Sequence, residues 1–426
     1  MRRYTKISLY GLVLIWIFSC KTGQMYTSKP AKNANNPDSD LLEVNAVAYH
    51  KKDSLTILFL QIKNDHLLYK RPDTSLAFYA ELYVSYRLFN EENTHQIIDS
   101  SSLRMIDRSG PETVVLKSLH HTFSLPTQKG KGYVLELEVL DVNKKTRYET
   151  KLNINRQSEF SPQNFLVTLN DTVSYTNNFL KRQKVMVRFA NPAINKVTVS
   201  CYVKEFGPAL PPFSVKESAE TLPQPDSSFT MDLNTNSFYL TMPEKGFYFV
   251  KPVGSAGDGL TLYTMDETFP GVGNSSDMIH CTRYIMNREE YENCLDAADK
   301  KAAIDKFWLG VGGSNERARE LLRRYYGRVK DANKYFTSYT QGWKSDRGMI
   351  FIVFGAPNNT YRSKKDEIWV YGNEANPSAL RFVFNKNQNP FSENDFVLER
   401  STFYKEAYYQ AVDYWRQGNV YIDGRK

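Results

Sequence analysis

Apolar and polar positions alternate along most of the chain between residues 41 and 273. From Tyr133 to Val139 every second residue is apolar, while Glu136 and Glu138 face the other way. This is the pattern of a half-buried antiparallel strand. Short runs of the same kind recur between Asp, Asn, Gly and Pro residues that favour turns. The pattern predicts two immunoglobulin-like β-sandwich domains, over residues 41–156 and 157–273.

A proline-rich segment interrupts the second of these regions. Between Phe206 and Ser228 the chain carries five prolines, and each removes a backbone donor that a central strand needs. We therefore expect a long loop that crosses between sheets. Such loops are candidate surfaces for partner proteins.

The spacing of apolar residues changes to that of helices after residue 273. Asn287 with Glu290 forms a capping-box sequence and predicts a helix that continues to about Phe307. Ser314 can cap a second helix that ends at Phe336, with apolar residues stepping by three and four positions. The opposite face of this helix is basic and includes Arg328, and we expect it to be exposed to solvent.

An unbroken apolar run, Met349–Phe354, predicts the first strand of an antiparallel sheet. A closing helix is expected from Phe403 to Gln417. Residues 274–426 thus predict an α+β domain, and the whole chain is expected to be multi-domain and mainly β, two sandwiches followed by this domain.

The first twenty residues have the features of a lipoprotein leader. Three basic residues precede the apolar run Ile7–Phe18, which is too short to span a bilayer. The segment "WIFSC", which ends at Cys20, resembles a bacterial lipobox, and this resemblance implies cleavage after residue 19 and acylation of Cys20. Lys21 resembles the residue that sends lipoproteins to the outer membrane. Residues 20–40 are polar and predict a flexible tether.

Charge alone leaves two classes of partner open. The net charge of +8 and the pI near 9.0 suit nucleic acid or anionic lipid. The leader decides against nucleic acid, because it sends the chain out of the cytoplasm. No acidic residue lies between Lys21 and Asn36, whereas lipoproteins that some bacteria export to the cell surface carry acidic residues there. We therefore expect an anchor on the periplasmic face of the outer membrane rather than on the cell surface.

Three cysteines remain after Cys20, so at least one thiol is unpaired. Cys201 lies in an alternating strand pattern and is expected to be a small buried apolar residue. The other two cysteines, Cys281 and Cys294, could form a disulfide or remain free, and their spacing alone does not decide between these states.

Catalytic and metal-binding signatures are missing from the sequence. It contains no HExxH, CxxC or GxSxG pattern. Gly310, Gly312 and Gly313 precede a helix but lack both the strand and the lysine of a phosphate loop. The sequence therefore predicts no enzyme activity, no metal and no cofactor.

The stretch "YTQGWKSDRGMIFIVFG", from Tyr339 to Gly355, concentrates charged, aromatic and glycine residues. Its candidate structural or binding residues are Gly342, Trp343, Ser345, Asp346, Arg347 and Gly348. Glycines permit unusual backbone geometry, and an aspartate can accept backbone N–H bonds at a turn. We interpret the stretch as a joint between a helix and a sheet, with ligand or partner binding as the alternative.

Several motifs of the last third resemble one known family. They are "FW" at residues 307–308, "RYYGRVKDANKYF" at 324–336, "GWKSDRGMIFIVFGAPN" at 342–358 and "EIWVYG" at 367–372. This series resembles the GWxTD-domain lipoproteins of Bacteroidota, with Ser345 in place of the threonine. The resemblance implies an envelope protein with β-rich N-terminal regions and no assigned enzymatic activity.

These observations predict a non-catalytic scaffold or partner-binding subunit, as part of an outer-membrane protein assembly or export complex. Two alternatives stay open. Exposed Tyr and Trp side chains could bind glycan or peptidoglycan, or Asp346, Arg347 and Glu367 could serve an unrecognised hydrolase. Burial distinguishes them, because a ligand site needs Trp343, Asp346 and Trp369 to line an open cleft.

Overall fold

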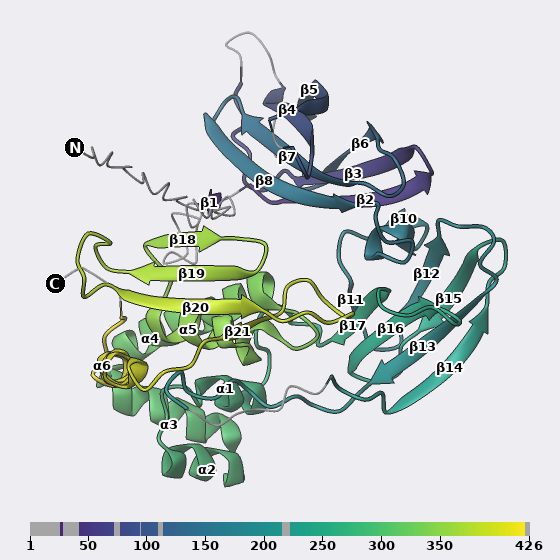
Figure 1. Ribbon diagram of the computed structural model, residues 1–426. Helices are drawn as coiled ribbons and strands as arrows, with labels where there is room; N and C mark the ends of the chain where they lie inside the picture. The colour runs from purple at the N-terminus through teal and green to yellow at the C-terminus, as the bar shows by residue number, and fades with distance from the viewer. Residues whose placement is uncertain are drawn as a thin grey trace, which may run out of the picture.

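The computed structural model describes residues 26–28, 42–71, 77–93, 95–109, 114–214 and 222–421. The predicted leader, Cys20 and most of the predicted tether lie outside this part of the chain. The described residues form two β-sandwiches and one unit that combines helices with a sheet (Figure 1). The chain is thus multi-domain and mainly β, as its pattern predicts. Within the described residues, no helix is both long and apolar enough to cross a bilayer.

Sandwich 1 packs a three-stranded sheet against a four-stranded sheet. The first sheet holds β2 Val44–Lys52, β3 Leu55–Lys63 and β6 Ser118–Pro126, and the second holds β5 Ile97–Ser109, β4 Phe78–Asn90, β7 Gly132–Asp141 and β8 Thr146–Asn155. The strands are divided between the sheets as in immunoglobulin-like folds. Tyr133, Leu135, Leu137 and Val139 on β7 are at most 4% exposed, which confirms the predicted alternation.

A buried histidine links the two sheets of sandwich 1. His50 on β2 is 2% exposed, and its Nε2 lies 3.0 Å from the carbonyl oxygen of Asn155 on β8. Because a carbonyl can only accept, Nε2 carries the proton, and Nδ1 accepts from the Thr56 hydroxyl at 2.9 Å. The ring is therefore neutral, and burial lowers the pKa of His50 to about 4.

Sandwich 2 contains a four-stranded and a five-stranded sheet. One sheet is ordered β10 Thr172–Val173, β9 Phe165–Leu169, β12 Lys184–Phe189 and β15 Ser237–Thr241, and the short 3-10 helix η1 Pro162–Asn164 precedes it. The other is ordered β11 Asn178–Leu180, β17 Leu260–Met265, β16 Gly246–Pro252, β13 Lys196–Tyr202 and β14 Ser227–Asp232. Cys201 on β13 is buried and free, in keeping with its strand pattern.

The third unit places helices beside a five-stranded antiparallel sheet (Figure 1). The helices are α1 Ser275–Thr282, α2 Arg288–Asp296, α3 Lys300–Gly312, α4 Asn315–Phe336, the 3-10 turn η2 Gly342–Lys344, α5 Asp346–Phe354 and α6 Tyr404–Arg416. The sheet is ordered β1 Tyr26–Ser28, β18 Asn359–Arg362, β19 Asp366–Tyr371, β20 Leu380–Lys386 and β21 Phe396–Leu398. Aromatic rings join the two layers: Phe336 of α4 lies 5.3 Å from Trp369, and Phe354 of α5 lies 5.1 Å from Phe382.

Two elements of this unit differ from the prediction. The run Met349–Phe354, predicted as a strand, belongs to helix α5. Every residue of α5 is buried, so the helix shows no polar face and its apolar run cannot be told from a buried strand. The helix predicted from Asn287 to Phe307 is two helices, because the chain is extended at Ala297 and Asp299 caps α3. The helices predicted after Ser314 and near the C-terminus are confirmed.

Sandwich 2 and the helical unit share an aromatic cluster. Phe391, in the segment between β20 and β21, lies 5.1 Å from Tyr202 and 5.1 Å from Phe249 between ring centroids. The Thr261 hydroxyl donates a hydrogen bond of 2.7 Å to the carbonyl of Phe391. Tyr339, which follows α4, adds a ring 6.0 Å from Phe247. These contacts bury aromatic surface on both sides and fix the two units against each other.

The sheet of the last unit also contains residues from near the N-terminus. Strand β1 pairs antiparallel with β18, and Tyr26 lies opposite Arg362. These three residues lie within the segment 20–40 that the sequence predicts to be a flexible tether. The edge strand of the last sheet thus comes from the part of the sequence that precedes sandwich 1.

Candidate functional site

The sequence from Gly342 to Gly348 forms a tight joint between helices α4 and α5. The predicted joint between a helix and a sheet is therefore wrong, because the apolar run that follows the turn is helix α5 and not a strand. A Cβ on Gly342 would lie 1.9 Å from the carbonyl oxygen of Ala332 in α4, and a Cβ on Gly348 would lie 1.9 Å from the carbonyl oxygen of Gly342. Glycine is therefore required at both positions by close backbone approach. Ser345 caps α5, since its hydroxyl accepts from the Gly348 amide at 3.0 Å and donates to the Gly342 carbonyl at 2.7 Å.

Trp343 is enclosed by this joint and is 5% exposed. Its amide donates to the Asn333 side chain at 3.1 Å, and its indole N–H donates to Gln341 at 2.8 Å. Its carbonyl accepts from the Tyr284 hydroxyl at 2.9 Å. All polar groups of Trp343 are thus satisfied inside the protein, and its ring does not line an open cleft.

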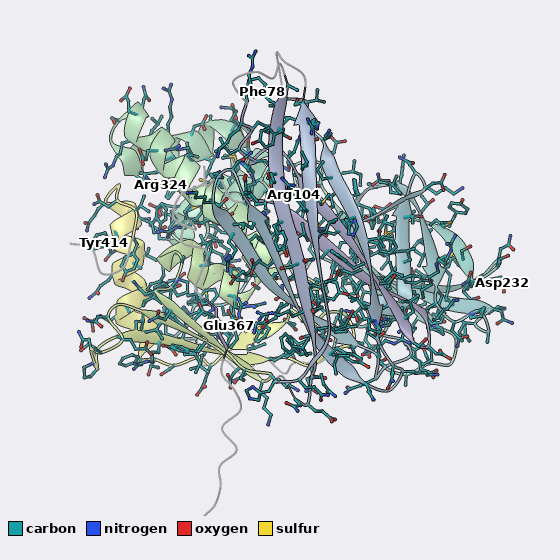
Figure 2. All side chains as sticks on the ribbon, turned by 90° about the horizontal axis from the view of Figure 1, so that it is seen from above. Phe78, Arg104, Asp232, Arg324, Glu367 and Tyr414 are labelled. Atoms are coloured by element: carbon teal, nitrogen blue, oxygen red, sulfur yellow. The ribbon has the colours of Figure 1, made fainter. Side chains whose placement is uncertain are left out.

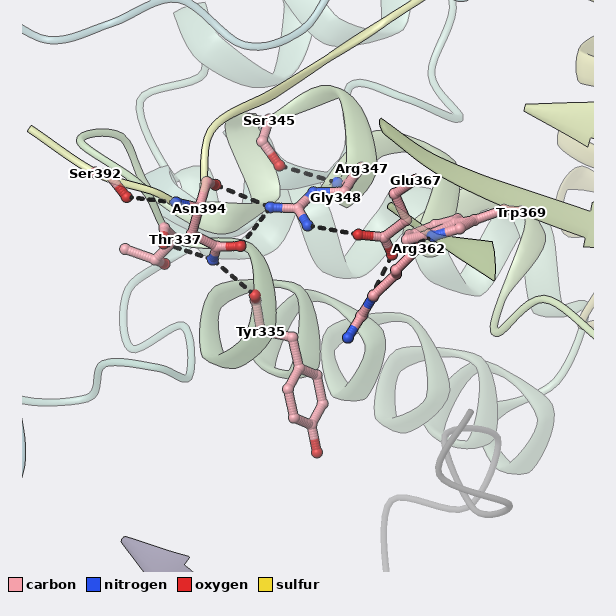
Figure 3. A network of polar contacts seen from close by, with 10 residues as sticks. All are labelled: Tyr335, Thr337, Ser345, Arg347, Gly348, Arg362, Glu367, Trp369, Ser392 and Asn394. Carbon is pink, nitrogen blue, oxygen red and sulfur yellow. Dashed lines mark hydrogen bonds and ion pairs between the residues drawn. The ribbon is translucent and has the colours of Figure 1, made fainter. Parts of the chain in front are cut away.

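Arg347 is the centre of a buried polar network (Figure 3). It donates to the Glu367 carboxylate on β19 at 3.1 Å, and to the carbonyl and the side-chain oxygen of Asn394 at 2.8 and 2.6 Å. Arg347 is 3% exposed and Glu367 is 2% exposed. Glu367 also accepts from Arg362 at 3.2 Å and from the Trp369 indole at 2.6 Å. A carboxylate held by three donors has little capacity left for a substrate.

Two aromatic rings flank the Arg347 guanidinium. Its central carbon lies 5.1 Å from the ring centroid of Phe336 and 4.3 Å from that of Phe396. Burial lowers the pKa of Arg347, and the Glu367 carboxylate opposes this effect. Cation–π contacts and the ion pair together hold the charge in the interior.

Asn394 extends the network to the end of helix α4. Its side-chain N–H groups donate to the carbonyls of Tyr335 and Thr337 at 2.9 and 3.0 Å. These carbonyls are at the C-terminal end of α4, where no intrahelical donor remains for them. One amide side chain therefore joins α4, α5 and the segment before β21 (Figure 3).

Asp346 points into a different set of contacts from Arg347. Its carboxylate accepts from the Leu398 amide at 2.8 Å and from the Arg400 guanidinium at 3.1 and 2.5 Å. Burial raises the pKa of Asp346, and the Arg400 charge opposes this shift. The sequence grouped Asp346, Arg347 and Glu367 as a hydrolase alternative. The structure pairs Arg347 with Glu367 but commits Asp346 to Arg400 and β21.

The proline-rich segment of sandwich 2 lies against this joint. The Ala209 amide donates to the carbonyl of Lys344 at 2.8 Å, and Arg400 donates to the carbonyl of Leu210 at 3.3 Å. The described part of the predicted loop therefore forms an internal contact. Lys344 itself is half-buried, and burial lowers its pKa.

A second buried arginine lies on the face of α4 that the sequence predicts to be basic and exposed, and for this residue the prediction is wrong. Arg328 of α4 is 4% exposed and donates to the carbonyls of Ile352 and Val353, at 3.0 and 3.2 Å. These carbonyls lie at the C-terminal end of α5, where a cation is favoured by the helix dipole. The guanidinium also lies 5.1 Å from the Trp415 ring centroid, and burial lowers its pKa to about 10.

Cys281 and Cys294 are both buried and free, so the disulfide considered from the sequence is not formed in this structure. Burial raises the pKa of the Cys281 thiol. The neighbouring His280 ring lies 2.8 Å from the Tyr291 hydroxyl. Among the described residues, no three His, Cys, Asp or Glu side chains are grouped so as to hold a metal ion.

A hollow of about 540 Å³ lies between sandwich 2 and the segment before β21. Its lining includes Tyr202, Phe249 and Phe391 together with polar Asn389 and Lys251. The three rings are at most 8% exposed and pack edge to face on one another. Their faces are thus occupied by protein, whereas a sugar-binding platform presents an aromatic face to solvent.

Partners of the motif residues could be predicted only in part. Glu367 was named from the sequence, together with Asp346 and Arg347, in the hydrolase alternative. Asn394 and Arg400 carried no such signal, since they lie 47 and 54 residues after their partners Arg347 and Asp346 in the sequence. Only the folded sheet brings them to the joint.

Comparison with known proteins identifies the last unit. The family model described as "GWxTD domain" matches residues 246–417. The match begins at the first residue of β16, so it includes two strands of sandwich 2. Below, the name GWxTD domain is used for the helical unit with its five-stranded sheet, and that sheet is called the GWxTD sheet. No curated protein matches the chain in sequence.

Solved structures match only remotely. A glycosyl hydrolase family 2 member from Bacteroides cellulosilyticus is 8% identical, with a TM-score of 0.19 over 30% of this chain and 16% of that chain. A putative beta-galactosidase from Bacteroides fragilis is 11% identical, with a TM-score of 0.19 over 32% and 20%. Salmonella alpha-2-macroglobulin is 12% identical, with a TM-score of 0.16 over 53% and 17%.

This chain thus spans a fifth or less of the length of these structures. Such low similarity carries no argument about fold or activity. The family match, in contrast, includes the whole joint from Gly342 to Gly348 and the network around it. The chain therefore contains a GWxTD domain, matched over residues 246–417.

Proposed function

We propose that the chain is a lipid-anchored envelope protein and acts as a non-catalytic scaffold or partner-binding subunit of an outer-membrane assembly or export complex. Acylated Cys20 would attach it to the periplasmic face of the outer membrane. This anchor rests on the leader sequence, because Cys20 lies outside the described residues. The two sandwiches and the GWxTD domain would form the part that partner proteins contact.

The observation that carries the proposal is the burial of the motif. Trp343, Asp346, Arg347, Glu367 and Trp369 are each at most 9% exposed. Every one of them has protein partners at hydrogen-bond distance. Side chains used in this way stabilise a fold, whereas binding or catalysis requires groups that a ligand can reach.

Rigid contact between units supports a scaffold role. The aromatic cluster around Phe391 and the loop contact at Lys344 attach sandwich 2 to the GWxTD domain at two places. A partner that binds one of these units would therefore be held at a fixed position relative to the other. Interfaces between domains are often smaller and more polar, and they then allow relative motion.

Exposed apolar side chains on sandwich 1 offer a contact surface. On the edge strand β5, Ile97 is 52% exposed and Ile106 is 44% exposed. In the segment before β6, Val115 is 64% and Leu116 is 72% exposed. Apolar groups in such positions are typical of protein interfaces, and an edge strand offers unpaired backbone groups as well.

A pull-down with a matched control tests the scaffold proposal. Tagged full-length protein is solubilised in mild detergent, and we expect a stoichiometric envelope protein to be recovered. The variant Val115→Asp with Leu116→Asp should lose this partner, while Val253→Asp, which changes a 50% exposed residue of sandwich 2, should retain it. Recovery of no stoichiometric partner would contradict the proposal.

Two further variants test the anchor and the structural role of the motif. Cys20→Ala should leave the membrane fraction after washing, and a variant that stays there would contradict lipid anchoring. Asp346→Ala should lower stability or complex formation. If it left both intact and abolished a hydrolytic activity, the motif would be catalytic and the proposal wrong.

A further inference from the structure

The pairing of β1 with β18 limits how far the GWxTD sheet can lie from a lipid on Cys20. Tyr26 lies opposite Arg362, Thr27 opposite Tyr361 and Ser28 opposite Thr360. Six residue steps separate Cys20 from Tyr26. A chain of this length spans at most about 20 Å when fully extended.

We propose that β1 acts as a docking strand that holds the edge of the GWxTD sheet against the membrane, with the turn between β18 and β19 directed at the lipid surface. This inference rests on the proposed lipid anchor at Cys20. It adds an orientation, because an anchor on a free tether would leave the protein able to take any pose above the membrane.

Without the pairing of β1, the lipid could lie much farther from the folded part of the chain. Without β1 pairing, the first fixed residue after Cys20 belongs to β2 at Val44, which is 24 residue steps away. A flexible chain of that length has a root-mean-square span of about 27 Å and a maximum of about 80 Å. Docking of three residues therefore shortens the maximum distance roughly fourfold and moves the attachment point from sandwich 1 to the GWxTD sheet.

Three residues of pairing would be weak between separate molecules. Here residues 29–43 join β1 to β2, so the strand stays close to its site at a high effective concentration. Without β1, β18 would be the edge strand of this sheet, and its free backbone groups could pair with any short extended segment. Docking in the same chain therefore needs only backbone hydrogen bonds and little side-chain specificity.

The turn that would face the lipid carries positive charge. Lys364 and Lys365 are exposed, and Lys364 forms an ion pair of 2.9 Å with Glu91 of sandwich 1. The ion pair neutralises Lys364, so Lys365 is the lysine of this turn that anionic headgroups would attract. The same turn thus contacts sandwich 1, so that the membrane-facing edge is shared by the first and last domains.

Fluorescence energy transfer to the membrane tests this orientation. The acylated full-length protein is placed in vesicles that carry an acceptor dye on lipid headgroups. The donor is attached at Lys365→Cys or, as the distant site, at Asp232→Cys on β14. Figure 2 places Asp232 at the far end of the molecule from Glu367, which pairs with Arg362 in the sheet. The remaining native thiols, Cys201, Cys281 and Cys294, are buried and should not be labelled.

We expect stronger transfer from the donor at position 365 than from the donor at position 232. Prolines at both Tyr26 and Thr27 should reduce the transfer from position 365, because neighbouring residues of a strand donate alternately and one of the two must lose a bond. Prolines at both Asn33 and Ala34 are the matched control and should leave it unchanged.

Equal transfer from the two sites, or no change with prolines at 26 and 27, would overturn the inference. Vesicle flotation separates this result from a failure of the anchor. If flotation depends on Cys20 while transfer is equal, only the orientation is wrong. If Cys20→Ala protein floats as the unsubstituted protein does, the anchor and the orientation both fail.

Discussion

Replacing Arg347 by methionine should strongly reduce the free energy of unfolding of the GWxTD domain. Methionine keeps the apolar stem between the rings of Phe336 and Phe396 but removes the charge. Glu367, which is 2% exposed, then loses its partner at 3.1 Å. Removal of one member of a buried ion pair costs about 3 to 5 kcal/mol, because the other charge is left in the interior.

The contacts that remain and those that are lost set the value within this range. Glu367 keeps Arg362 at 3.2 Å and the Trp369 indole at 2.6 Å, which favours the lower end. Asn394 loses two hydrogen bonds from the charged Arg347, each worth about 1.5 to 3 kcal/mol, which favours the upper end and brings the expected value to the middle of the range. We therefore expect Arg347→Met to reduce the free energy of unfolding by about 4 kcal/mol.

A double-mutant cycle isolates the ion pair. Glu367→Gln removes the negative charge and keeps an oxygen for the Trp369 indole. In the Arg347→Met background this second change should cost at least about 1.5 kcal/mol less than it costs alone, since no buried charge is then stranded. Denaturant unfolding by tryptophan fluorescence gives these values, because four of the five tryptophans lie between residues 308 and 415.

A solvated ion pair in the same domain is the control. Lys301 and Asp305 form a pair of 2.7 Å on α3, with side chains 76% and 45% exposed. Lys301→Met should change the unfolding free energy by less than about 0.5 kcal/mol. If Arg347→Met cost less than about 1 kcal/mol, or if the cycle showed no coupling, our account of the buried network would be refuted.

Four further predictions concern single residues. His50 has a pKa of about 4 in the fold and an ordinary value of 6.5 when unfolded. The free energy of unfolding should therefore be highest above pH 6.5 and fall by about 3 kcal/mol as the pH drops toward 4, because only the unfolded chain binds the proton in this range. Urea unfolding followed by circular dichroism should show a weaker fall of the unfolding free energy with acid for His50→Gln. Gly342→Ala should cost more than about 3 kcal/mol because of its backbone clash, whereas Gly310→Ala, with nothing within 4 Å, should stabilise α3 by about 0.5 to 1 kcal/mol in the same denaturant assay. Ser345→Ala should cost about 1 kcal/mol and lower the melting temperature, and Ser345→Thr should restore the cap. The Cys281 thiol should react with a thiol reagent only after denaturation, and a reducing agent should leave the melting temperature unchanged, since it forms no disulfide in the structure.

The sequence predicted those parts of the fold in which one face of an element is solvated. Strand β7 and helix α4 each carry polar residues at regular intervals, and both were found with nearly correct bounds. Helix α5 has no solvated face, because the rest of the domain surrounds it, and its apolar run was predicted as a strand. The spacing of polar residues identifies an element as a helix or a strand only when one of its faces is exposed to solvent. Elements buried on all sides, at the centre of a domain, can therefore be assigned to the wrong type.

The candidate site was located from the sequence, but its connections were not. The glycines, the tryptophan and the charged pair of the motif identified the joint and suggested a structural role. Apart from Glu367 on β19, the acceptors and donors that satisfy Asp346 and Arg347 come from the segment around β21, which has no distinctive composition. Arg328 was assigned to the solvated face of α4 because an arginine is usually exposed. Its carbonyl partners at the end of α5 depend on how two helices pack, which residue spacing in one helix does not reveal.

The motif makes sense as one mechanical unit. Gly342 lets the turn approach α4, Ser345 starts α5, and Asp346 and Arg347 point in two directions from the first turn of that helix. One reaches Arg400 beyond β21, and the other reaches Glu367 on β19. The side chains of Asp346 and Arg347 thus bind other parts of the domain, and their polar groups are directed at these partners rather than at solvent. Substitutions here should therefore act on any function of the protein in proportion to the stability they remove. A function that changed while the unfolding free energy stayed constant would have to reside on another surface, and the exposed edge of sandwich 1 is where we would look for it.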